Sequence, residues 1–110
     1  MEESETSISG NFHVFEQAMK SGDDFIVKFI LDNFLEPPYI KQLIEKMKPT
    51  LINDFLRTFT DYIQRKPESL AKALPWIETC IDRWENEITA SSICQKRIAD
   101  LQYVLRQRTQ

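Results

Sequence analysis

Glycine is scarce in this chain: only Gly10 and Gly22 occur among 110 residues. Sheets and tight hairpins usually need more, because their turns use backbone conformations with positive φ that glycine supplies. A phosphate-binding loop needs several glycines close together, so the sequence excludes that type of nucleotide site. No segment of four or more residues alternates apolar and polar side chains as a half-buried strand does. The chain is therefore predicted to be all-α.

Residues that carry chemistry are also few. His13 is the only histidine, and Cys80 and Cys94 are the only cysteines. These numbers exclude a zinc site of the usual Cys/His type and a disulfide framework. Cys80 falls in an apolar stripe, where a thiolate is disfavoured, and we expect both thiols to be reduced and buried. The sequence thus predicts no catalysis, no metal and no cofactor, with His13 on the surface.

Long apolar runs are missing as well. No run approaches the roughly 18 apolar residues that a membrane span needs. The first nine residues are acidic and polar, unlike a secretory signal. We therefore expect a protein that stays inside the cell and does not enter a membrane.

The charge is small but unevenly distributed. The net charge of −3 argues against a surface built to grip nucleic acid as a whole. Residues 1–36 carry eight acidic and two basic side chains, whereas residues 92–110 carry four basic side chains against Asp100 alone. These two regions could attract each other within the fold or across a partner, or they could simply be solvated faces.

Apolar residues recur at helical spacing in a series of segments separated by proline, glycine or small polar residues. Pro75 falls within one such stripe, and we expect it to open a new helix, where its missing N–H does no harm. Residues 1–10 hold too little apolar surface to repay ordering, which predicts a disordered tail before a helical domain over residues 11–110. The predicted helices span residues 12–20, 23–34, 38–46, 50–66, 68–73, 75–89 and 92–108.

This pattern predicts six or seven antiparallel helices joined by short loops. Helical hairpins in series stack as a bundle or as a short α-solenoid, and we expect the solenoid-like arrangement. Aromatic residues near the C-terminal end fit either core packing or a contact with a second chain. The candidate interface residues are Trp76, Trp84, Leu101, Tyr103, Val104 and Leu105.

Three segments also carry a resemblance to a known family. They are FEQAMKSGDD at residues 15–24, RKPESLAKALPWI at residues 65–77, and LQYVLRQR at residues 101–108. Together they resemble the C-terminal helical domain of WD-repeat subunits of the small-subunit processome, the U-three snoRNA-associated proteins. The resemblance extends over residues 15–108, with no propeller before it, which suggests a C-terminal fragment of a longer WD-repeat protein.

The resemblance implies a scaffold function without catalysis. Such domains join subunits by packing against the matching domains of sister subunits, so it implies a hetero-oligomer. It also implies a nucleolar ribonucleoprotein that acts in ribosome biogenesis, in processing of the small-subunit ribosomal RNA. The short length favours the subcomplex that binds the pre-rRNA leader early.

Two other functions fit the same sequence. One is an RNA-contacting module in which the last helix uses Lys96, Arg97, Arg106 and Arg108, with Tyr103 available to stack on a base. The other is an unrelated intracellular adaptor with a similar helical fold, because a fold does not determine a function.

Overall fold

The computed structural model describes the backbone of residues 2–109 and the side chains of residues 10–107. Over this part of the chain it shows six α-helices and one 3-10 helix, with no strand, which confirms the all-α prediction. The elements are α1 (Glu2–Ser21), α2 (Asp24–Asn33), α3 (Pro37–Lys46), α4 (Pro49–Arg65), η1 (Pro67–Ser69), α5 (Leu70–Ala90) and α6 (Ser92–Thr109).

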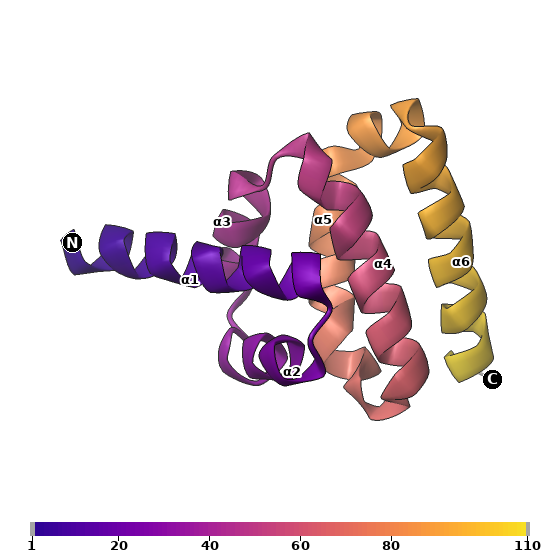
Figure 1. Ribbon diagram of the computed structural model, residues 1–110, viewed down its shortest axis with the longest axis horizontal. Helices are drawn as coiled ribbons and strands as arrows, with labels where there is room; N and C mark the ends of the chain where they lie inside the picture. Colours follow the sequence, from indigo (N-terminus) through magenta and orange to yellow (C-terminus); the bar gives the residue numbers. More distant parts are fainter. Residues whose placement is uncertain (1, 110) are drawn as a thin grey trace.

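Helix α4 lies in the middle of the fold and packs against α1, α5 and α6. Helix α5 runs antiparallel to α4 and to α6, as the short connections predict, so α4 and α6 run in the same direction (Figure 1). Helix α1 crosses this group, while α2 packs on α1 and α3 packs on α5. The antiparallel hairpin pattern is therefore clearest in the C-terminal half, and the whole is a compact all-α fold.

Gly22 and Asp23 form the turn between α1 and α2. Gly22 has a φ of 68° and its N–H donates to the carbonyl of Ala18 at 2.9 Å, a left-handed helix ending that favours glycine. The carboxylate of Asp23 then accepts hydrogen bonds from the N–H groups of Phe25 and Ile26, which caps α2.

Pro75 does not open a helix, contrary to the sequence-based prediction. It lies inside α5, which continues from Leu70 through Pro75 to Ala90. The one residue of α5 with non-helical dihedral angles is Trp84, at φ −113° and ψ 22°. Pro75 comes early in the helix, so it removes only the N–H that would bond to the carbonyl of Ala71. The helix tolerates that single loss.

The N-terminal segment also differs from the prediction. Helix α1 begins at Glu2 rather than near Phe12, so residues 2–10 are helical in the structure instead of a disordered tail. These first turns project from the rest of the fold (Figure 1). The sequence supplies Glu2, Glu3 and Glu5 at this end, and negative charge near a helix N-terminus is favourable.

An aromatic cluster joins α1, α4 and α5 in the core. The rings of Phe15 and Trp76 stack with centroids 5.3 Å apart and planes 17° apart. Phe55 lies 6.1 Å from Phe15 and 4.5 Å from Phe59, whose ring is in turn 6.4 Å from Trp76. All four side chains are fully buried, so this cluster fixes how α1 lies across the C-terminal helices.

Candidate functional site

Trp76 belongs to the core rather than to a binding surface. Its side chain is fully buried against Phe15 and Phe59, so it cannot touch a partner in this conformation. Its indole Nε1 is also buried and has no hydrogen-bond partner within the described part of the chain. The prediction that Trp76 contributes to an interface is therefore wrong for this fold.

Trp84 also serves packing. Its side chain is 6% exposed, and its indole Nε1 donates a 3.1 Å hydrogen bond to the backbone carbonyl of Ile44. The guanidinium of Arg83 lies 4.2 Å from the ring centroid, a cation–π distance. These contacts tie the bend in α5 to the last turn of α3. Trp84 is therefore a core residue like Trp76, and the prediction that it contributes to an interface is wrong for this fold.

The four candidate interface residues on α6 divide between core and surface. Leu101 and Val104 are buried and Leu105 is half-buried against the core, which removes the first two from any surface. Tyr103 is 62% exposed. Of the six residues proposed from the sequence, Tyr103 alone presents a large aromatic surface to a partner.

The basic residues of α6 do not form one exposed row. The Nε of Arg97 donates to the amide oxygen of Asn53 at 2.9 Å, so this half-buried side chain joins α6 to α4. Lys96 and Arg106 are exposed, whereas the side chain of Arg108 lies outside the described residues. Of the cations in the predicted RNA contact, Lys96 and Arg106 thus lie on the surface, whereas Arg97 packs between α6 and α4.

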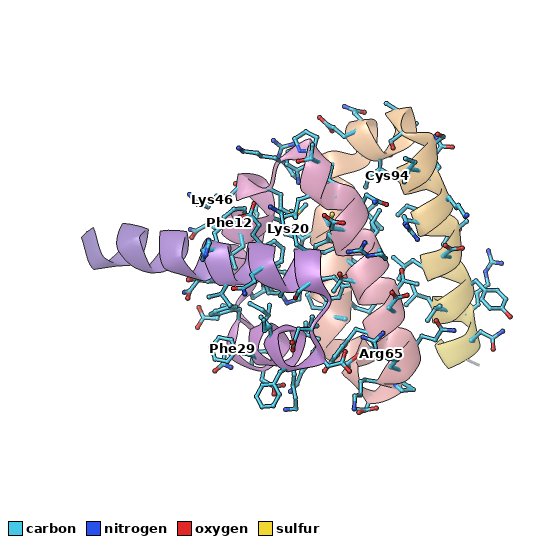
Figure 2. All side chains as sticks on the ribbon, in the orientation of Figure 1. Phe12, Lys20, Phe29, Lys46, Arg65 and Cys94 are labelled. Atoms are coloured by element: carbon cyan, nitrogen blue, oxygen red, sulfur yellow. The ribbon has the colours of Figure 1, made fainter. Side chains whose placement is uncertain are left out.

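The largest exposed aromatic surface lies elsewhere, on α2 and the segment after it. Phe25 is 86% exposed, and Phe29, four residues later in α2 and labelled in Figure 2, is 49% exposed. Leu35, just beyond the helix, is 58% exposed. We call Phe25, Phe29, Phe34, Leu35 and Tyr39 the α2 aromatic face.

Ring contacts join three of the residues of the α2 aromatic face, Phe29, Phe34 and Tyr39. Phe29 meets Phe34 edge to face with centroids 6.0 Å apart, and Phe34 stacks on Tyr39 at 5.4 Å. The side-chain amide of Asn11 in α1 donates a hydrogen bond to the hydroxyl of Tyr39. A groove of about 340 Å³ runs along this end, lined by Asn11, Asn33, Phe34, Leu35, Glu36 and Tyr39. The face is therefore a pre-formed surface with a shallow recess.

Charged side chains border the same face. Asp32 accepts hydrogen bonds of 2.6 Å from both Lys28 and Lys72. These bonds lower the pKa of the Asp32 carboxyl, and the bond from Lys28 has the larger effect. Arg65 pairs with Asp24 at 2.5 Å near the start of α2. Glu36 is exposed at the far end. The aromatic rings are thus bordered by ion pairs and by the exposed carboxylate of Glu36.

Periodicity alone did not find this face. The sequence places Phe25, Ile26, Phe29, Ile30 and Phe34 in one apolar stripe, which reads as core. In the structure α2 buries Ile30 of this stripe together with Val27 and Leu31, whereas Phe25 and Phe29 are exposed. The usable signal was that α2 is apolar on both sides, which marks a helix that buries more than one face.

The rest of the described chain adds little chemistry. No three His, Cys, Asp or Glu residues of the described chain come close enough together to hold a metal ion. None of the helices formed by the described residues has the length and apolar character needed to cross a bilayer. Burial, with a smaller contribution from Cys94, raises the pKa of the Cys80 thiol to about 12.

Comparison with known proteins does not indicate a function, so the function is inferred from the geometry of this chain. No family model matches the sequence. Neither the curated proteins nor the solved structures contain a match. The α2 aromatic face is therefore the strongest candidate site that the structure itself provides.

Proposed function

We propose that this chain is a non-catalytic protein-interaction domain that binds its partner through the α2 aromatic face. The exposure of Phe25 at 86%, on a rigid helix capped by Asp23, is the observation that carries this proposal. Large exposed aromatic side chains that cluster on an ordered element are typical of protein interfaces. The domain needs little rearrangement to bind a partner through such a face, and this favours affinity.

We further propose that the domain is a scaffold within the small-subunit processome and acts in the nucleolus. The three segments of the family resemblance support this proposal. They fall at the α1–α2 turn, at the α4–η1–α5 junction and in α6, so they coincide with elements that set the fold. In this proposal the partners are the helical domains of sister subunits, and the chain is the C-terminal part of a longer WD-repeat protein.

An unrelated helical adaptor would use the same α2 aromatic face for a different partner, so the identity of the captured proteins separates the two functions. The RNA-contacting function has weaker support, because Arg97 is engaged with Asn53. A dependence of RNA binding on Lys96 and Arg106 would favour it.

The experiment is an affinity capture from nucleolar extract with three versions of the chain. These are the wild type, the double variant Phe25→Asp with Phe29→Asp, and the control Ile93→Asp. Ile93 is 60% exposed on α6, so the control places the same charge on an exposed apolar position away from the α2 aromatic face. We expect WD-repeat processome subunits with the wild type and the control, and their loss with the double variant.

Capture of the same subunits by all three versions would contradict the use of the α2 aromatic face. Capture of other proteins, lost in the double variant, would support the interaction domain but assign it to the adaptor function. A thermal unfolding curve for each version confirms that the substitutions leave the fold intact.

A further inference from the structure

The groove between the end of α2 and the start of α3 contains a carboxylate without a counter-charge. We call it the α2–α3 groove, and its lining residues are Asn11, Asn33, Phe34, Leu35, Glu36 and Tyr39. The side chain of Glu36 is exposed and forms no ion pair with another residue of the described chain. The two lysines that pair with Asp32 line a separate recess, and Arg65 lines a third. The charge of Glu36 is therefore available to a ligand.

The backbone around the groove favours a positive ligand as well. The last carbonyls of a helix have no helical N–H to accept from, and the helix dipole is negative at that end. The last turn of α2 contains no basic side chain to offset this potential. Helix α3 opens with Pro37 and Pro38, which have no N–H, and the N–H groups of Tyr39 and Ile40 both bond to the Glu36 carbonyl. The start of α3 thus offers none of the free donors that an anion needs.

The side chains that line the groove suit a flat cation. Phe34 and Tyr39 are half-buried, and their rings stack with centroids 5.4 Å apart. Aromatic rings attract cations, and a planar guanidinium group also stacks on them, which an ammonium group does not. The side-chain NH2 of Asn33 donates to the carbonyl of Phe29 at 2.8 Å, which leaves the amide oxygen of Asn33 to accept a hydrogen bond.

From this arrangement we infer that the α2–α3 groove binds an arginine side chain of the partner protein. The guanidinium group pairs with the carboxylate of Glu36 and lies against the ring of Tyr39, while the arginine methylenes cover Leu35. The inference rests on the proposed function, because the groove belongs to the α2 aromatic face. It adds the chemistry of the partner, which presents an arginine next to the apolar side chains that meet Phe25 and Phe29.

A titration with small probes tests the inference on the full chain. The probe is N-acetyl-arginine amide, and N-acetyl-citrulline amide is its neutral match of nearly the same shape. N-acetyl-lysine amide carries the same charge without the planar group. Each compound is added at millimolar concentrations to the nitrogen-15-labelled protein, and the backbone amide signals are followed by NMR. We expect saturable shifts at residues 33–39 with arginine, and binding at least about tenfold weaker with citrulline and several-fold weaker with lysine.

Matched variants locate the binding. Glu36→Gln removes the charge and keeps the size of the side chain, and Glu36 makes no side-chain hydrogen bond that caps α3, so the fold should be unchanged. Glu45→Gln is the control, because Glu45 is an exposed carboxylate of α3 outside the groove. We expect Glu36→Gln to weaken arginine binding at least about tenfold and the control to leave it unchanged. Added salt should also weaken arginine binding.

Three results would overturn the inference. Equal binding of arginine and citrulline would show that the charge of the groove is not used, and equal binding of arginine and lysine would remove the preference for a guanidinium group. Arginine binding that is absent, or that is unchanged in Glu36→Gln, would show that the groove does not take this side chain. If processome subunits are still captured through Phe25 and Phe29, the proposed function stands and only the arginine assignment fails.

Discussion

The hydroxyl of Thr58 in α4 donates a 2.7 Å hydrogen bond to the backbone carbonyl of Met19 in the last turn of α1. Carbonyls in that turn have no following helical N–H to accept from, so they need an outside donor. Both groups are buried. Gly22 lies close to them, since a Cβ atom built on Gly22 would be 3.8 Å from Thr58 Oγ1. This bond fixes the end of α1 against the central helix.

Thr58→Val should lower the free energy of unfolding by about 1–3 kcal/mol, because it leaves a buried carbonyl without a donor. Thr60→Val is the matched control. Thr60 is also buried in α4, but its hydroxyl bonds to the Leu56 carbonyl four residues earlier, which the helix itself already engages. The control should change stability by about 0.5 kcal/mol or less. Urea unfolding measures both, and equal effects would show that the bond to Met19 contributes nothing.

Pro75→Ala tests whether α5 is one helix through residue 75. Inside a continuous helix, alanine restores the N–H and removes the clash of the proline ring, so the variant should gain on the order of 1–2 kcal/mol. If residue 75 instead opened a separate helix, the N–H that alanine adds there would have no helical acceptor and the gain would vanish. Thermal unfolding of the two proteins distinguishes the cases by the sign and size of the shift in Tm.

Cys80 should resist alkylation in the folded protein. With a pKa of about 12, its thiolate fraction at pH 8 is about one in ten thousand, against about one in ten at the ordinary value of 9.0. Iodoacetamide labelling followed by mass spectrometry should therefore modify Cys80 only when urea is present. Rapid labelling of Cys80 without urea would contradict its burial in the core.

The same shift predicts a loss of stability at alkaline pH. The unfolded thiol releases its proton near pH 9.0, whereas the folded thiol keeps its proton up to about pH 12. The contribution of Cys80 is thus fully present below pH 9.0 and declines above it, by at most about 1.4 kcal/mol per pH unit. Urea titrations at successive pH values measure this slope, and Cys80→Ala should flatten it. An equal slope in that variant would assign the loss to other groups.

Local signals predicted the helical character of this chain well. Features that depend on a few neighbouring residues are visible in a sequence to within a residue or two. They include the left-handed turn at Gly22 and the acidic start of α2, whereas the prediction placed Asp23 inside α2 and began α4 after Pro49. Pro75 was misread because its cost in a helix is a preference, which the packing of Trp76 and Ile77 in the core overrides.

The candidate site was predicted less well, for a physical reason. Spacing shows which residues share a helix side but not which side faces the core, and α2 and α5 carry apolar residues on more than one side. Trp76 turned inward onto Phe15 and Phe59, while Phe25 turned outward. These directions depend on how the helices pack on one another, through contacts that are far apart in the sequence.

Photo-crosslinking from position 25 most directly tests whether the α2 aromatic face binds the partner. A benzophenone amino acid replaces Phe25, which is 86% exposed, and in a parallel sample it replaces Ile93, which is 60% exposed. Both proteins are irradiated in the same extract under the same conditions. If the α2 aromatic face binds the partner, a covalent adduct forms from position 25 and little or none forms from position 93. Adducts from position 93 with none from position 25 would show that the chain meets its partner through another surface.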